Sequence, residues 1–369
     1  MKHLIAKRMS KMESSGIRRI FDLVAKLKNP CNLSIGQPDF DTPEPVKQEA
    51  IKWIQAGFNK YTQTQGITEL REEVAKKLRE RNGITADAER VLITSGVMGG
   101  FYLACCVLFD PGDEVMMLDP YFVAYKQIVS LMGGRPVCVN TYPDFHPKAA
   151  AIKKAVTEKT KAIIINSPNN PTGHVYRRED IKRIVEIAER NDILVISDEV
   201  YEPFVYAGEH VSPGSLSENV LTLNGFSKTA SITGWRIGYA AGPAAIMEEM
   251  KKLQQYSFVC APSFAQKAMV STMDVDISAH IGRYRQRRDR LYDELHSLYP
   301  MKKPEGAFYL FPEARGESGA AFVEKAISKE LLVIPGNAFS ERDTHFRISY
   351  AAPEAQIERG IAILKELAR

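Results

Sequence analysis

Short apolar runs alternate with longer amphipathic segments through the middle of the chain. Runs such as AIII and ILVI are apolar at successive residues, which is typical of strands buried on both faces of a parallel sheet. Residues 177–190, between two of these runs, have apolar positions at helical spacing. The alternation predicts an open, doubly wound α/β domain. The expected strands are Arg90–Thr94, Asp113–Leu118, Arg135–Asn140, Lys161–Asn166, Asp192–Ser197, Asn219–Leu223 and Arg236–Ala241.

The two ends of the chain follow a different pattern. Residues 1–30 predict a helix or two, and residues 283–299 predict a charged helix. Strands are expected in AFYLF, LLVIPG and HFRISY, with a further helix near residues 319–330. This mixture predicts a smaller α+β domain that draws on both ends of the chain. We therefore expect a large domain of residues 44–280, inserted between the two parts of a small domain, residues 1–43 and 281–369.

Composition narrows the class of protein. The 369 residues include 49 Lys and Arg against 45 Asp and Glu, a net charge of +4 that argues against a nucleic-acid binder relying on bulk charge. The basic N-terminal segment has no apolar core of signal-peptide length, and no apolar run is long enough for a membrane span. The five cysteines form no CxxC pair, and the histidines show no metal-ligand spacing. We expect a cytoplasmic protein with reduced thiols and no metal site.

Candidate chemistry follows the ends of the expected strands, because ligands of an open α/β sheet bind beyond the carboxyl ends of its strands. The turn SGVMGG precedes a helix, where it could bind phosphate through backbone N–H groups or simply make a tight turn. Asp198 follows an apolar run and either caps a helix or serves a buried partner. Lys228 lies in a turn of small residues, where it is either solvated or partly desolvated, and Arg236 begins the next strand.

Taken together, these residues describe one ligand. Its phosphate would bind the glycine-rich turn and Arg236, its basic ring nitrogen would pair with Asp198, and its carbonyl would react with Lys228. Pyridoxal phosphate has all three groups, and proteins hold it as a lysine Schiff base with a carboxylate at the ring nitrogen.

The segment GFSKTASITGWRIG, residues 225–238, resembles the lysine signature of the class I/II pyridoxal-phosphate aminotransferases. The resemblance extends over nearly the whole chain, and it implies a fold-type-I α/β enzyme with a large, mostly parallel seven-stranded sheet. It also implies a homodimer whose active sites lie at the subunit boundary. The other family-like segments, in the family's order, are IGQPDFDTPE, NKYTQTQGITELR, SGVMGG, DPYFVAY, SPNNPTG, SDEVY, GAFYLFP, IPGNAF and FRISYA.

The resemblance assigns the reacting groups by position. Lys228 would bond to the cofactor and then move the proton between the substrate α-carbon and the cofactor. Asp198 would keep the ring nitrogen protonated, so that the ring accepts the electrons released at the α-carbon. Tyr201 and Asn170 would hydrogen-bond the phenolic oxygen, and Phe122 would stack on the ring.

The remaining assignments concern the phosphate and the substrate carboxylate. Backbone N–H groups of Val97 and Met98 would bind the phosphate, together with Arg236 and the Ser227 hydroxyl. Tyr61 would reach the phosphate of the other subunit. Arg347 would hold the substrate α-carboxylate in a bidentate pair, beside Asn170 and the Gly36 backbone.

The sequence defines less clearly which residues would bind the side chain of the substrate. Aspartate-specific relatives supply a cation before an Asn-Pro or Ala-Pro element or in the phosphate turn, but here Tyr256 and Phe258 precede Ala261-Pro262 and the turn has Met98. These departures favour an aromatic or other large neutral side chain. Arg18 and Arg19 are either a solvated helix face or a closing cation for 2-oxoglutarate or aspartate.

The sequence therefore predicts an aminotransferase that moves the amino group of an L-amino acid (aromatic, aspartate or broad) to a 2-oxo acid by a ping-pong mechanism, with 2-oxoglutarate as the expected acceptor. Two alternatives remain at this point. A C–S β-lyase would use the same scaffold, and a ligand-sensing regulator would use it without catalysis.

Overall fold

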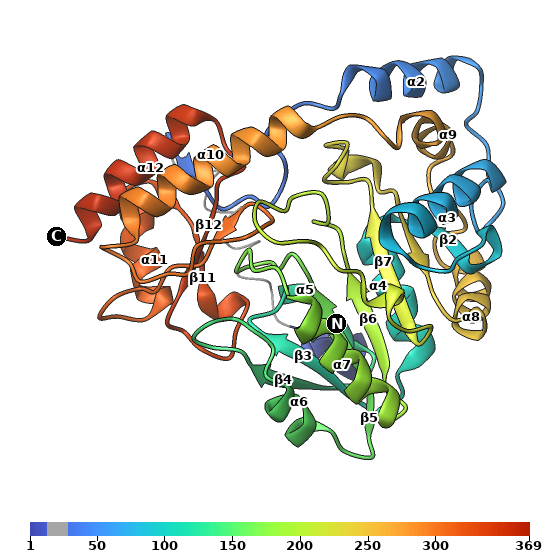
Figure 1. Cartoon of the computed structure of the whole chain (residues 1–369), viewed down its shortest axis with the longest axis horizontal. Helices are drawn as coiled ribbons and strands as arrows, with labels where there is room; N and C mark the ends of the chain where they lie inside the picture. The colour runs from blue at the N-terminus through green and yellow to red at the C-terminus, as the bar shows by residue number, and fades with distance from the viewer. Residues whose placement is uncertain (13–28) are drawn as a thin grey trace.

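A seven-stranded sheet forms the centre of the computed structural model, which describes residues 1–12 and 29–369 (Figure 1). The strand order is β2-β8-β7-β6-β5-β3-β4. All neighbours run parallel except β8, which is antiparallel to both β2 and β7. The strands are β2 (Val91–Thr94), β3 (Glu114–Asp119), β4 (Arg135–Asn140), β5 (Thr160–Asn166), β6 (Leu194–Asp198), β7 (Val220–Gly225) and β8 (Gly238–Ala241). Each expected strand is present, with ends displaced by at most two residues.

Helices cover both faces of this sheet, which explains why its strands are apolar at successive residues. In β5, Ala162 and Ile164 pack on one face, whereas Ile163 and Ile165 pack on the other. The first face is covered by α4 (Gly96–Leu108), α5 (Val123–Leu131) and α8 (Ala244–Gln255). The second is covered by α2 (Glu44–Gln55), α3 (Thr68–Asn82), α6 (Ala149–Ala155), α7 (Arg178–Arg190) and α9 (Ser263–Thr272).

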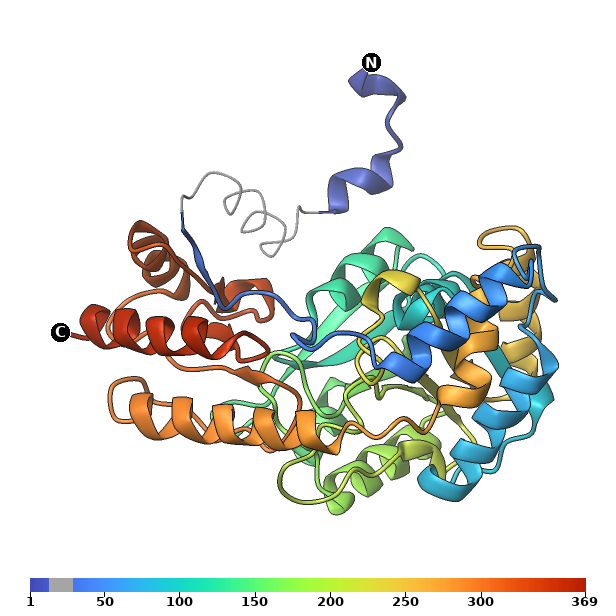
Figure 2. The same cartoon turned by 90° about the horizontal axis from the view of Figure 1, so that it is seen from above.

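Two small sheets join the N-terminal segment to the C-terminal part of the chain. β1 (Cys31–Asn32) runs parallel to β10 (Leu331–Leu332). β12 (Phe346–Ser349) pairs antiparallel with β11 (Ile334–Pro335) on one side and β9 (Tyr309–Leu310) on the other. The helices α10 (Ser278–Leu295) and α12 (Glu354–Leu367) lie side by side next to these sheets, with α11 (Gly319–Ser328) nearby (Figure 2). The pairing of β1 with β10 supports a discontinuous small domain, and the limits 1–43, 281–369 and 44–280 stay a prediction.

The N-terminal prediction is only partly testable. Residues 1–12 contain two short 3₁₀ helices, Lys2–Leu4 and Lys7–Lys11, and residues 13–28, to which the same prediction applies, lie outside the described part of the chain. Arg18 and Arg19 lie outside the described residues.

All five cysteines are free thiols, although only Cys31 and Cys105 are buried. Within the described ranges, no helix is both long and apolar enough to cross a membrane.

An ion pair buried beside the sheet links α3 to the turn after β6. Lys77 Nζ lies 2.5 Å from a carboxylate oxygen of Glu202, and both side chains are 15% exposed. Glu202 also accepts hydrogen bonds from Asn82 at 3.1 Å and Asn224 at 2.7 Å. Removing one partner of such a pair leaves a buried charge without compensation.

Lys77→Ala is therefore expected to lower the free energy of unfolding by about 3–5 kcal/mol, measured by urea denaturation. The double substitution Lys77→Met with Glu202→Leu should cost less than Lys77→Ala alone. Lys252→Ala is the control, since its pair with Glu249 is 65% and 50% exposed and should contribute at most about 1 kcal/mol. A loss for Lys77→Ala as small as that of the control would contradict this account of the pair.

Candidate active site

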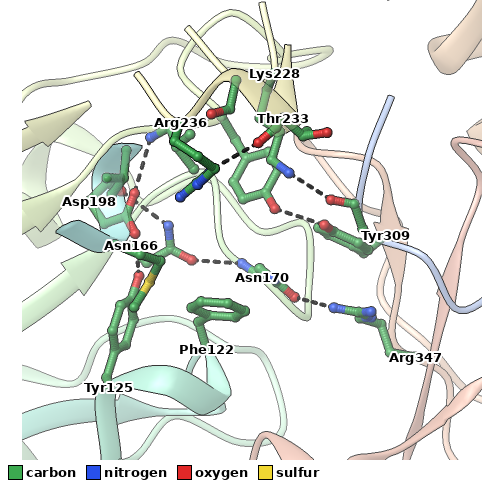
Figure 3. A pocket seen from close by; sticks show the side chains of 16 residues that line it. Phe122, Tyr125, Asn166, Asn170, Asp198, Lys228, Thr233, Arg236, Tyr309 and Arg347 are labelled. Carbon is green, nitrogen blue, oxygen red and sulfur yellow. Dashed lines mark hydrogen bonds between the residues drawn. The ribbon is translucent and has the colours of Figure 1, made fainter. Parts of the chain in front are cut away.

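A cavity of about 270 Å³ opens at the carboxyl ends of the parallel strands, where the sequence places its candidate chemistry. Every predicted site residue except Tyr61 lines it (Figure 3). The parallel register brings the last residues of β5 and β6, Asn166 and Asp198, side by side. Arg347 reaches the same cavity from β12, so the large sheet and a small sheet both contribute.

Lys228 follows the end of β7. Its amine donates a hydrogen bond to the carbonyl oxygen of Gly36 at 2.6 Å, so its partner is a neutral acceptor. Burial, helped by the charges of Arg347 and Arg236, lowers the pKa of Lys228 to about 8. Much of the amine is therefore uncharged at mildly alkaline pH, and the uncharged amine is the nucleophilic form.

Asp198 is the last residue of β6 and caps no helix, so its carboxylate is not the helix cap that the sequence analysis offered as an alternative. One carboxylate oxygen accepts a hydrogen bond from the Tyr125 hydroxyl at 2.6 Å, and the other accepts one from the backbone N–H of Val200 at 3.2 Å. Both donors are neutral. Burial raises the pKa of Asp198 to about 6, against the effect of these hydrogen bonds. The carboxylate is thus poised to pair with a cationic group of a ligand.

An anion cradle forms where α4 begins. The N–H groups of Val97 and Met98 belong to the first turn of this 13-residue helix, whose early N–H groups have no intrahelical partner. Arg236 lies beside this turn in a left-handed backbone conformation, φ +55°, and donates to the Thr233 carbonyl at 2.8 Å. A Cβ at Gly96 would lie 2.6 Å from the Arg236 guanidinium, so only glycine permits this approach.

Arg347 is buried at the opposite end of the cavity. Its guanidinium donates to Asn170 Oδ1 at 2.9 Å and to the Ser34 carbonyl at 2.7 Å. Its Nε has no hydrogen-bond partner within residues 1–12 and 29–369. A buried guanidinium with a free donor is suited to bind a carboxylate.

The three predicted aromatic residues have different outcomes. Phe122 and Tyr201 line the cavity, as does the predicted hydroxyl residue Ser227. Tyr61 lies elsewhere, with 84% of its surface exposed, and the structure of a single chain does not test its expected role in a second subunit.

Four polar residues of the cavity are absent from the sequence prediction. They are Tyr125, Asn166, Thr233 and Tyr309. Asn166 could have been predicted as a site residue from the sequence, because it ends an apolar strand just as Asp198 does. Tyr125 lies on α5, and Phe122 is the residue that precedes this helix; the centres of their rings are 5.6 Å apart. Tyr309 lies in the apolar run AFYLF, where an ordinary core residue was the natural expectation.

One group of described residues has spacing suitable for a metal ion. Ligand atoms of Glu199, Glu202 and His210 lie within 4.8 Å of one another. Lys77 already pairs with Glu202, and His210 Nε2 lies 2.9 Å from a carboxylate oxygen of Glu199. The acids are therefore already compensated, and we assign no metal to them.

Comparison with known proteins gives a consistent result. The model of the family described as aminotransferase class I and II matches residues 28–364. A probable aspartate aminotransferase of Methanocaldococcus jannaschii is 36% identical, covering 99% of this chain and 100% of the relative. Aromatic-amino-acid aminotransferase 2 of Thermococcus litoralis is 37% identical over 98% of both chains. The structure of Thermus thermophilus aspartate aminotransferase with maleate superposes with a TM-score of 0.94 at 34% identity, covering 98% and 99% of the two chains.

The raised pKa of Asp198 predicts a pH-dependent cost of burial in the ligand-free protein. The carboxyl ionises near pH 4 in the unfolded chain and near pH 6 in the folded one, so this group favours folding less as the pH rises from 4 to 6. Asp198→Asn should therefore stabilise the ligand-free protein at pH 8. The gain should be about 1 kcal/mol smaller at pH 5, because one pKa unit corresponds to about 1.4 kcal/mol.

Urea denaturation of both proteins at the two pH values measures this difference. Asp192→Asn, at an exposed turn, is the control and should show no such dependence. An equal effect of Asp198→Asn at pH 5 and pH 8 would contradict the cause we give for the pKa of this residue.

Proposed function

The chain belongs to the class I and II aminotransferases and transfers amino groups, and we propose that it does so with pyridoxal phosphate bound in the cavity described above. The family depends on this cofactor. We further propose that an L-amino acid donates its amino group and that a 2-oxo acid, 2-oxoglutarate, accepts it in a second half-reaction. The observation that carries this proposal is the convergence of Lys228, Asp198, Arg236 and Arg347 on one cavity.

The cavity fits the cofactor by its chemistry. Lys228 has an amine with a lowered pKa and a neutral partner, and Asp198 has a buried carboxylate whose two partners are neutral. The first turn of α4 and Arg236 form a cradle that a side chain at Gly96 would fill. These features suit an aldehyde, a basic ring nitrogen and a phosphate, respectively.

When bound, pyridoxal phosphate supplies an aldehyde that bonds to amines and a ring that accepts the electron pair released at the substrate α-carbon. Asp198 holds the proton on the ring nitrogen, since its carboxylate is the acceptor that a protonated nitrogen requires. Tyr201 and Asn170 donate hydrogen bonds to the phenolic oxygen. Phe122 packs against the ring and limits access of water to it.

The phosphate and the substrate carboxylate bind at opposite ends of the cavity. The N–H groups of Val97 and Met98, the Ser227 hydroxyl and Arg236 bind the phosphate. Arg347 binds the α-carboxylate through its free Nε–H and the neighbouring N–H groups. Asn170 and Gly36 border the same space and orient the substrate.

Lys228 acts as the proton carrier at the substrate α-carbon. Where it is not bonded to the cofactor, this amine would be available to carry the proton. With a pKa lowered to about 8, the free amine both accepts and returns a proton near neutral pH, which is the range that general acid–base catalysis requires.

For the amino donor we propose an aromatic or other large neutral amino acid. Met98 and Phe122 line the cavity. The cations among its described lining residues are Lys228, Arg236 and Arg347, which are already assigned to the aldehyde, the phosphate and the α-carboxylate. Phe258 lies 3.8 Å from the Cβ position of Gly99, next to the phosphate cradle. Relatives named for aspartate and for aromatic amino acids are similarly close in identity, so the names alone do not favour one donor.

A homodimer is part of the proposal. Tyr61 is 84% exposed and Tyr256 is 82% exposed, which is unusual for large aromatic side chains. A second copy of the chain would cover them and would bring its Tyr61 to the phosphate. A cytoplasmic location is likewise proposed from the sequence.

The alternatives receive no support. The relatives quoted above are named as aminotransferases, so a C–S β-lyase is not favoured. A purely ligand-sensing role gains nothing from a lysine whose pKa is lowered toward the range of proton transfer.

Lys228→Ala tests the assignment of the cofactor lysine. Borohydride should fix pyridoxal phosphate covalently to the wild-type protein, because it reduces the carbon–nitrogen bond to the lysine. Intact-mass spectrometry should find no such adduct in Lys228→Ala. Lys267→Ala, at a lysine paired with Glu69 outside the cavity, should retain it. An adduct on Lys228→Ala would show that another lysine carries the cofactor.

A panel of amino donors tests the substrate proposal. Phenylalanine and tyrosine should react with 2-oxoglutarate with kcat/KM at least about tenfold above that of aspartate, since one apolar pocket contact contributes about 1–3 kcal/mol. The panel should include alanine and the branched-chain amino acids. A preference for aspartate would refute the apolar pocket and would direct attention to Arg18 and Arg19.

A further inference from the structure

Tyr309 contacts both Arg347, which is proposed to bind the substrate carboxylate, and Tyr201, which is proposed to bind the cofactor. In the small sheet it pairs with Ser349 of β12, so Arg347, two residues away along β12, is its diagonal neighbour on the same face of the sheet. The backbone register thus places the ring of Tyr309 next to the guanidinium that the proposed function assigns to the substrate carboxylate.

The ring of Tyr309 holds that guanidinium on one side. The Arg347 guanidinium carbon lies 4.6 Å from the centre of the Tyr309 ring and 4.7 Å from the centre of the Phe339 ring. Arg347 is 1% exposed, and a desolvated cation gains most from aromatic faces. With two of its N–H groups bound to Asn170 and Ser34, the guanidinium keeps one orientation.

The hydroxyl of Tyr309 serves a different partner. It lies 2.7 Å from the hydroxyl of Tyr201, and both side chains are buried. A Cβ at position 36 would lie 2.5 Å from the Tyr309 oxygen, so the hydroxyl has its place only because residue 36 is glycine. The carbonyl of that glycine accepts the hydrogen bond of Lys228.

Two paired hydroxyls share one hydrogen bond, in which one donates and the other accepts. If Tyr309 donates, the hydrogen of Tyr201 remains available to the cavity. Tyr201 can then donate to the phenolic oxygen of the cofactor, as the proposed function requires. The reverse arrangement would direct the Tyr201 hydrogen away from the cofactor.

We propose that Tyr309 is a positioning residue with two separable parts: its ring fixes Arg347 for the substrate carboxylate, and its hydroxyl directs the hydrogen of Tyr201 toward the cofactor. The inference rests on the proposed function. It adds a residue of the small sheet through which carboxylate binding and the hydrogen bonding of the cofactor are linked.

Two substitutions separate the parts. Tyr309→Phe keeps the ring and removes the hydroxyl, whereas Tyr309→Leu removes both. Tyr309→Phe should shift upward the pKa read from the visible absorbance of the bound cofactor, because a weaker donor to the phenolic oxygen stabilises its deprotonated state less. It should lower kcat several-fold and leave the dissociation constant of maleate, a dicarboxylate without an amino group, within twofold of wild type. Tyr309→Leu should in addition weaken maleate binding at least tenfold.

Tyr350→Phe is the matched control. Tyr350 is a fully buried tyrosine next to the end of β12, and its hydroxyl bonds to the Ala307 carbonyl at 3.3 Å, outside the cavity. It should change neither the absorbance pKa nor maleate binding. Thermal unfolding of all variants identifies misfolded protein. If Tyr309→Leu does not fold, Tyr309→Phe alone still tests whether the hydroxyl directs the hydrogen of Tyr201.

An unchanged absorbance pKa in Tyr309→Phe, or equal maleate binding by the Phe and Leu variants, would overturn the inference. Wild-type protein without a visible band would instead refute the proposed function itself. The two failures are therefore distinguishable.

Discussion

The burial of the Asp198 carboxylate at the end of β6 is the constraint on which the site depends. Among the described residues of the cavity, its hydrogen-bond donors are neutral, namely the Tyr125 hydroxyl and the backbone N–H of Val200, and its pKa is raised to about 6. Burying an ionisable group in this environment costs stability, and in the proposed function a cationic ring nitrogen would pair with it. The parallel sheet sets the position, because neighbouring strands end at the same edge and deliver Asn166, Asp198 and the turn with Lys228 together.

The second half of the site comes from the ends of the chain. β12 carries Arg347, β9 carries Tyr309, and Gly36 follows β1 by a few residues. Arg347 and Tyr309 therefore lie on one small sheet, in which β9 pairs with β12, and Gly36 follows a strand of the other, in which β1 pairs with β10. Contacts such as those of Tyr309 with Tyr201, and of Arg347 with Asn170, bridge the small sheets and the large one. These contacts connect the residue proposed to bind the substrate carboxylate with residues proposed to bind the cofactor.

The fold was largely predictable because its signal is local. Strands buried on both faces are apolar at successive residues, so all seven strands of the large sheet are evident, within two residues, from runs such as AIII. The reactive residues follow strand ends and could be found by the same logic. Tyr309 and Tyr125 could not, because their importance comes from contacts with residues far away in the sequence. The expected role of Tyr61 involves a second chain, which the structure of a single chain does not test. Of the helix or two expected in residues 1–30, the described part contains the 3₁₀ helices Lys2–Leu4 and Lys7–Lys11.

In the proposed function, one cavity holds the amino group of the donor until the acceptor arrives in the second half-reaction. The most direct test incubates the holoenzyme with an L-amino acid in the absence of any 2-oxo acid and measures the products with time. The account predicts one equivalent of 2-oxo acid per chain, no ammonia, and no further reaction until 2-oxoglutarate is added. Continuous release of 2-oxo acid and ammonia, or no release at all, would contradict it.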